Sequence, residues 1–293
     1  MTIPFFKLHL AGDDCILVAQ EKLAPLGFKP DGEFLGDIAR ALLDRRCGVG
    51  GRACIFVESN PGQGQQVLQV RVYRKDGTED RSGYDGLWCA ARWALDTGRT
   101  SGGNVELVRQ GRTHTLIPTD SRSFMAEIRA PRGRRMTLIV DGHPTAAYVF
   151  EYEGRYAVAL ASGSGAVDGP SPKRIRLALD SMEESAVPVV VGFQGADVVR
   201  LISHDWADRL ASAVCAAAAI REAGRNTAGT IAEWRGSGGA VSYATFSPPQ
   251  GDAALSDSAA LIDRGRFWLE WTGPETLRVA GMAEYSFEGT YDY

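Results

Sequence analysis

The stretch from Asp76 to Arg92 decides how the first half of the chain folds. It reads Asp76-Gly-Thr-Glu-Asp-Arg-Ser-Gly-Tyr-Asp-Gly-Leu-Trp-Cys-Ala-Ala-Arg92. Its opening residues are rich in Asp, Gly and Ser, which favour turns. From Gly86 onward the apolar residues recur at helical spacing, which predicts a helix over residues 86–95. Residues 67–73, just before the stretch, are typical of a strand. The sequence here therefore predicts a strand, a turn and a helix of mostly small residues.

Strand signals dominate the rest of the chain, as short runs of β-branched and aromatic residues between turn formers. The predicted strands are 5–18, 53–58, 105–108 and 124–129 in the first half, and 136–140, 146–152, 156–160, 187–193, 198–203, 230–234, 240–246, 267–271, 277–280 and 284–289 in the second. Two more helices are predicted, one with an apolar face over 32–43 and one rich in alanine from Trp206 until Gly224 ends it. Each half thus combines many strands with one small-residue helix, which fits a tightly surrounded position.

Composition narrows the class of protein. A length of 293 residues predicts about two domains, and the net charge of -4 lacks the basic surface expected of a nucleic-acid-binding protein. No apolar run reaches the roughly 18 residues that span a bilayer, and the first residues do not resemble a signal peptide. Five cysteines without close pairing fit reduced thiols. These features predict a cytoplasmic protein with no membrane segment, and no residue spacing indicates a metal site or a nucleotide cofactor.

The Asp76–Arg92 stretch resembles the catalytic stretch of diaminopimelate epimerase, which reads approximately D-G-S-E-x-x-x-C-G-N-G-x-R-C-x-A-R. Five other segments are similar to motifs of that family in the same order along the chain: 5–14, 43–50, 70–77, 215–219 and 280–289. Because they span nearly the whole chain in family order, chance agreement is a poor explanation. The sequence is therefore identified as a divergent relative of this epimerase family.

The resemblance implies an α+β fold of two similar domains. Each would be a curved, barrel-like and mostly antiparallel sheet wrapped around a central helix, with the active site in a cleft between the domains. The implied first domain comprises residues 1–131 plus about 277–293, and the second comprises 132–276. The resemblance also implies a small-molecule substrate and chemistry without a cofactor. Because family members are often dimers, it leaves a homodimer open.

Several positions depart from the family pattern. The two catalytic cysteines of the family fall on Gly83 and Leu210, so neither position carries a proton that could be moved. Arg74 stands where the family has an asparagine, and Trp88 replaces an arginine. If the resemblance holds, the two-thiol mechanism of amino-acid epimerisation is excluded, because that mechanism needs a titratable thiol on each face of the substrate.

Five other residues are candidates for acid–base chemistry: His204, Asp205, Asp14, Tyr84 and Asp85. A histidine titrates near neutrality and a neighbouring carboxylate tunes it, which favours His204 with Asp205. Each candidate also has a structural interpretation. Asp14 suits a turn, Asp85 suits a helix N-cap, Tyr84 could pack in the interior, and the His204–Asp205 pair could lie in a surface loop.

The predicted substrate site is built from the starts of the two central helices, because free N–H groups there bind anions. Its predicted members are Gly83, Gly86, Trp88, Leu210, Ala211, Ser212 and Arg74. Trp88 and Leu210 add apolar surface, which indicates a larger and less polar ligand than an amino acid. The 247–258 segment, rich in Ser, Pro and Asp, is expected to be a loop excursion whose role is open.

Three functions fit these observations. The first is a repurposed enzyme that carries out isomerase, tautomerase or cyclase-type acid–base chemistry on a bulky, partly apolar biosynthetic intermediate. The second is a non-catalytic protein of the same fold that binds a ligand or a protein partner. The third is a structural subunit whose cleft has closed.

Overall fold

A computed structural model describes residues 2–10, 12–23, 32–59, 67–80, 84–100, 103–152, 155–160, 174, 189–194, 198–202, 209–222, 231–235, 241–247 and 266–293. The chain divides into two compact units. Unit 1 comprises Met1–Ala126 and Gly281–Tyr293, and unit 2 comprises Glu127–Ala280. Nearly all of the predicted loop excursion at 247–258 lies outside the described residues.

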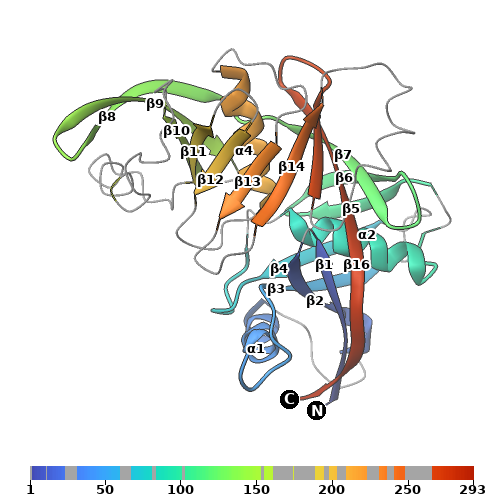
Figure 1. The fold of residues 1–293 in the computed structure, drawn as a ribbon. Coiled ribbons are helices and arrows are strands. Elements are labelled where there is room, and N and C mark those ends of the chain that lie inside the picture. The colour runs from blue at the N-terminus through green and yellow to red at the C-terminus, as the bar shows by residue number, and fades with distance from the viewer. Residues whose placement is uncertain are drawn as a thin grey trace. The chain divides into compact units, whose positions relative to one another are not determined.

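Unit 1 is built around a barrel-like sheet of eight strands in the order β1-β2-β3-β4-β5-β6-β7-β16 (Figure 1). Their bounds are β1 Thr2–Leu10, β2 Asp13–Ala19, β3 Ala53–Ser59, β4 Leu68–Tyr73, β5 Val105–Arg109, β6 Arg112–Pro118, β7 Ser123–Arg129 and β16 Thr276–Asp292. The ring closes because β16 also pairs with β1, with Thr2 opposite Asp292 and Leu10 opposite Ala283. A closed ring leaves no free sheet edge to pair with another chain.

The helix α2, Asp85–Asp96, lies against the inner face of this sheet and contacts β1 to β5. Its apolar residues, Leu87, Ala90, Ala91 and Ala94, are almost completely buried, as helical spacing in the sequence predicts. Gly86 permits the close approach, because a Cβ atom there would come within 2.9 Å of Val72 Cγ2. Small residues on α2 therefore let a helix fit inside a ring of only eight strands.

The helix α1, Gly32–Leu43, covers the opposite face, where it packs on β3 and β4. Leu35, Ile38 and Leu42 face a buried cluster that includes Ile16 and Phe56. The short 3-10 helix η1, Gln20–Lys22, follows β2. Unit 1 therefore has two apolar layers, one between α1 and the outer face of the sheet and one between α2 and its inner face.

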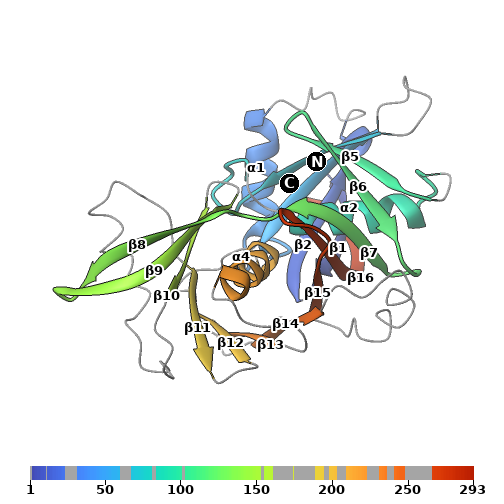
Figure 2. The same ribbon diagram turned by 90° about the horizontal axis from the view of Figure 1, so that it is seen from above.

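Unit 2 repeats the theme with the helix α4, Arg209–Glu222, which contacts seven strands of β8 to β15 (Figure 2). Its sheet runs in the order β15-β14-β13-β12-β11-β10-β9-β8, with bounds β8 Gly133–Val140, β9 His143–Tyr152, β10 Arg155–Leu160, β11 Val189–Gln194, β12 Val198–Ile202, β13 Ile231–Arg235, β14 Val241–Ser247 and β15 Arg266–Trp271. Parallel and antiparallel pairings alternate from β10 to β15. The low polarity of α4 on all sides suits a helix that strands surround.

The mixed α+β class and the barrel-like sheet predicted from the sequence are confirmed, and α1 has the predicted bounds. The sheet of unit 1 is mostly antiparallel, as predicted, with two parallel pairings, β2 with β3 and β4 with β5. The run at 5–18 forms two strands instead of one, because Gly12 adopts a φ of 82° in the turn between them. The strand β6 is an addition that the sequence analysis did not predict.

Candidate functional site

Several polar residues of unit 1 lie at the edge of the barrel where α2 begins. In the sheet order, β2, β3 and β6 begin at this edge, while β4 and β5 end there. We call this set the α2 rim and define it as Asp13, Arg52, Arg74, Asp80, Tyr84, Arg109 and His114. The topology of the ring thus brings together residues that are as much as a hundred positions apart in the sequence.

The segment that leads into α2 is held at the rim by an arginine on each side. Arg74 donates to Asp80 Oδ1 at 2.8 Å, and Arg109 donates to the backbone carbonyl of Asp80. The backbone N–H of Asp80 donates to the Val72 carbonyl at 2.7 Å, which extends the strand contact beyond β4. Because Asp80 is buried, its carboxylate and its backbone carbonyl hold Arg74 and Arg109 in defined positions.

A glycine contact sets the turn that carries Arg74. Gly77 has a φ of 81°, and a Cβ atom on Gly36 of α1 would lie only 2.5 Å from the Gly77 carbonyl oxygen. Arg40 of α1 also donates to the Asp76 carbonyl, at 3.2 and 3.3 Å. The outer helix therefore fixes the turn before the rim segment, and this is why the Asp-Gly pair of the sequence folds as it does.

The second charged pair at the rim is Asp13 with Arg52. Asp13 is the first residue of β2 and is 2% exposed, and its carboxylate accepts a hydrogen bond from the Arg52 guanidinium. The Arg52 charge also acts on Arg74, where it opposes the increase in pKa that the hydrogen bond to Asp80 causes. The rim therefore carries two neighbouring ion pairs, Arg52 with Asp13 and Arg74 with Asp80.

Within the described residues, the N-cap residue of α2, Tyr84, makes no side-chain hydrogen bond to the helix, while its carbonyl accepts from Leu87 N–H at 2.9 Å. The first N–H groups of a helix carry a partial positive charge and bind anions. Tyr84 itself is almost buried, and its ring meets the His114 ring edge-on, with 5.4 Å between the centroids. The rim thus joins a helix N-terminus, arginines and a phenol beside an imidazole.

Asp14, a predicted acid–base residue, is held by two cations instead. Its two carboxylate oxygens accept from Lys7 Nζ and from Arg45, each at 2.8 Å. Burial acts to raise the pKa of Asp14, but the hydrogen bonds and charges of Lys7 and Arg45 outweigh burial and lower it. A carboxylate that stays ionised and is clamped in this way favours the structural interpretation of Asp14.

The lowered pKa gives a pH-dependent contribution to stability. Because the folded-state pKa of Asp14 lies below its ordinary value of 3.8, this stabilisation is fully present above about pH 4 and is lost as pH falls through the folded-state pKa. We expect Asp14→Asn to lower the free energy of unfolding by about 1 kcal/mol at pH 7. Urea titrations of both proteins at pH 7 and near pH 3 should show that the difference shrinks in acid. An equal difference at both pH values would contradict the assignment.

Two predicted members of the substrate site, Trp88 and Gly86, lie in the interior of unit 1. Trp88 has no exposed surface, and its indole N–H donates to the Phe124 carbonyl at 2.8 Å. The cysteines near the rim are also interior residues, and the pKa of the Cys15 thiol is raised, first by its hydrogen bond with Cys89 and then by burial. The raised pKa makes the Cys15 thiol unsuited to be a nucleophile.

Of the remaining predicted site residues, some lie outside the described residues and others are described only by their backbone. His204, Asp205 and Gly83 lie outside the described residues. Asp85 begins α2, while Ala211 and Ser212 lie in the first turn of α4, and only the backbone of these three residues is described. Leu210, in the same turn of α4, has no exposed surface. The structure therefore brings Arg74 and Tyr84 together at the rim but gives no account of the His204–Asp205 pair.

Four rim residues were missed by the sequence analysis: Asp80, Arg52, Arg109 and His114. A local signal for the strand that carries His114 was present. Gln110-Gly111 forms a two-residue hairpin turn, with φ values of 50° and 72°, and this turn brings β6 back along β5. Arg52 and Asp13 are 39 positions apart, so no local pattern links them. Only the parallel pairing of β2 with β3 makes them neighbours.

No protein-family model matches the chain. It is 26% identical over 142 residues to the O-ureido-serine racemase of Streptomyces lavendulae, which covers 48% of this chain and 46% of the racemase. It is 30% identical over 107 residues to the diaminopimelate epimerase of Methanopyrus kandleri, which covers 36% of this chain and 34% of the epimerase. Both matches span less than half of the relative's own length.

Two solved structures extend the likeness to the whole fold. A phenazine biosynthesis protein of the PhzF family from Enterococcus faecalis matches with a TM-score of 0.59 and 11% identity over 100% of both chains. A methylitaconate-delta-isomerase matches with a TM-score of 0.56 and 11% identity over 99% of this chain and 95% of the isomerase. At such low identity the likeness concerns the fold alone. Among the helices of the described ranges, none combines the length and the apolar character needed to cross a bilayer.

Proposed function

We propose that this distant homologue of diaminopimelate epimerases is an isomerase with a rebuilt site, which its likeness in fold to a methylitaconate-delta-isomerase also supports. The reaction proposed is a proton shift in a small molecule that carries a carboxylate or develops an enolate. The observation that supports it most is that α2 begins at the same barrel edge as Arg52 and Arg74. The N–H groups of a helix start and of guanidinium side chains are donors that can stabilise an anion that forms as a proton leaves carbon.

The acid–base group proposed within unit 1 is Tyr84, with His114 against its ring. The position before it, Gly83, corresponds to a catalytic cysteine in the epimerase family and has no proton to give. In the proposed step a C–H bond next to the carboxylate breaks, the electron pair shifts through the conjugated system, and a proton returns at its far end. No atom is gained or lost, and His204 with Asp205 is proposed as the second acid–base pair.

The substrate is proposed to be a biosynthetic intermediate. Trp88 and Leu210, the residues that predicted a bulky and partly apolar substrate, have no exposed surface in the structure. The carboxylate therefore remains the part of the substrate that the described residues support, while its apolar part rests on the family pattern alone. A site between two similar domains remains a proposal for the same reason.

The test follows hydrogen exchange in deuterated water by proton NMR. We expect exchange in at least one member of a panel of β,γ-unsaturated and 2-oxo carboxylates, and none at Cα of meso-diaminopimelate. Tyr84→Phe should lower the exchange rate by about 100-fold or more, in line with the usual contribution of a general acid or base. The matched control is Tyr148→Phe, a substitution in β9 of unit 2, which should leave the rate unchanged.

The outcomes separate the alternatives. Exchange at Cα of meso-diaminopimelate would contradict the loss of epimerase chemistry. A full rate in Tyr84→Phe would remove Tyr84 from the mechanism. Saturable binding of carboxylates with no exchange in any of them would favour the non-catalytic protein of the same fold, an alternative supported by the clamped Asp14 and the buried Trp88.

A further inference from the structure

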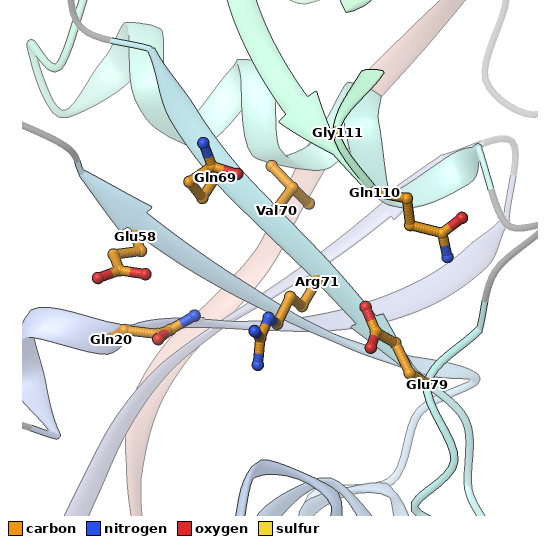
Figure 3. Close-up of a pocket in the computed structure, with 8 residues that line it drawn as sticks. All are labelled: Gln20, Glu58, Gln69, Val70, Arg71, Glu79, Gln110 and Gly111. Atoms are coloured by element: carbon orange, nitrogen blue, oxygen red, sulfur yellow. The ribbon is translucent and has the colours of Figure 1, made fainter. Parts of the chain in front are cut away.

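A groove of about 470 Å³ follows the outer face of β4, on the side of the sheet opposite α2. Figure 3 shows the side chains along it, which come from four parts of unit 1: Gln20 of η1, Glu58 of β3, Gln69 and Arg71 of β4, and Glu79 and Gln110 of the adjoining turns. Gly86 of α2 packs on Val72, whose side chain points to the inner face, whereas Arg71 beside it is exposed on the outer face. The groove is therefore separate from the α2 rim.

The charged side chains of the groove have no partners among the described residues. The side chains of Arg71, Glu58 and Glu79 make no hydrogen bond or ion pair there, although their backbones pair with neighbouring strands or bridge to them. In this respect they differ from Arg74, Arg52 and the other rim charges, which are paired within unit 1. A single unpaired charge on a surface is ordinary, but three of both signs around one groove are available to a ligand.

A buried amide supplies a second, independent observation. Gln20 is only 6% exposed, yet across the described residues its side chain has no hydrogen-bond partner, and it lines the groove. Figure 3 shows its amide directed toward the Arg71 guanidinium and the space beside it. The Gln20 amide atoms are not among the fully enclosed polar atoms without a partner, so they remain accessible to a ligand in the groove. The groove therefore has a fixed polar contact point as well as its charges.

The charges alternate in sign along the groove. Glu58 lies opposite Gln69 at one end of β4, Arg71 is two residues further along, and Glu79 bridges to Tyr73 at the other end. At about 3.3 Å per residue, each acidic side chain is anchored about 7 Å from Arg71 along the strand. A complementary ligand has a carboxylate for Arg71 and cationic nitrogens for the two glutamates.

We infer that this groove is a binding site for a basic amino acid, meaning a small molecule with one carboxylate and two ammonium groups. The carboxylate pairs with Arg71 and accepts from the Gln20 amide, and the ammonium groups pair with Glu58 and Glu79. The groove volume lies within the range of small-molecule pockets, roughly 300–1,000 Å³. Charge-assisted contacts of this kind give specificity for a polar ligand, since each is stronger than a neutral hydrogen bond.

L-lysine is the probe, and isothermal titration calorimetry of the whole chain measures its binding. We expect saturable binding of L-lysine, with weaker binding of 6-aminohexanoate, which lacks one ammonium group, and of cadaverine, which lacks the carboxylate. Arg71→Gln, Glu58→Gln and Glu79→Gln should each weaken L-lysine binding about tenfold or more. Because all three side chains are exposed, their replacement should leave the fold intact, and circular dichroism checks this.

Two control variants make the test specific. Arg46→Gln removes another exposed arginine of unit 1 and should leave L-lysine binding unchanged. Tyr84→Phe changes the α2 rim and should also leave L-lysine binding unchanged, so failure of the proposed isomerase site and failure of this site are distinguishable. The inference is overturned if L-lysine shows no saturable binding, if L-glutamate binds more tightly than L-lysine, or if Arg71→Gln binds L-lysine as well as the unaltered protein does.

Discussion

Replacing Arg52 by methionine should lower the free energy of unfolding by about 3–5 kcal/mol, because it removes the cation that pairs with a buried carboxylate. Asp13 is 2% exposed, and its side chain accepts from the Arg52 guanidinium. The cost of Arg52→Met is mainly the charge left behind on Asp13, since a buried ion without its partner is strongly destabilising. Urea denaturation monitored by circular dichroism measures the loss.

A second substitution separates the cost of the unpaired charge from the cost of lost packing. In the double variant Asp13→Leu with Arg52→Met no buried charge remains, so we expect it to recover much of the stability that Arg52→Met loses. Arg46→Met, at an exposed position, should change stability by less than about 0.5 kcal/mol. If Arg52→Met costs less than about 1 kcal/mol, the Asp13–Arg52 pair does not stabilise the rim in the way inferred.

Replacing Trp88 by alanine should also cost about 3–5 kcal/mol, the usual range for deleting a large aromatic side chain from a core. Trp88 has no exposed surface and lies on α2 inside the barrel of unit 1. Its loss leaves a cavity, and it also leaves the Phe124 carbonyl without the indole N–H that donates to it. Both effects act on the contact between α2 and β7.

Trp88→Phe tests the two parts of that cost. It keeps most of the aromatic volume and removes the N–H, so we expect a loss of about 1–3 kcal/mol, less than that of Trp88→Ala. Ile139→Ala, at a side chain that is 60% exposed, serves as the control and should be nearly neutral. Stability that is unchanged in Trp88→Ala would show that the ring lies outside the core and would reopen its predicted role in binding substrate.

The elements that the sequence predicts well are those whose signals are local. The helix over 32–43 has an apolar face, and the helix after Tyr84 has a run of small residues, so each pattern repeats every turn. The strand β6 lacked such a signal because Arg112, Thr113 and Thr115 are polar and mostly exposed, and only Leu116 is fully buried. Alternation cannot be recognised in a strand that presents so little surface to the core.

The rim was only partly predictable, for a different reason. Arg74 and Tyr84 were found because Arg74 lies just before the family's catalytic stretch and Tyr84 lies within it. The pairing of Asp13 with Arg52 depends on the parallel register of β2 and β3. Asp14 was a candidate acid or base, and its two cationic partners come from β1 and from the turn after α1. Charge pairing across strands is set by the fold and leaves no spacing in the sequence.

The pairing of β1 with β16 has a consequence for the order in which the protein can form. Chains are made from the N-terminus at about 5–20 residues per second, so β1 emerges from the ribosome long before its partner. Phe5 faces Gly289, and nearly all of unit 2 is synthesised between them. The backbone N–H and C=O groups of β1 that pair with β16 therefore stay without that partner until translation is almost complete. Such contacts between distant parts of the chain slow folding and lengthen the time during which a nascent barrel can bind the wrong edge.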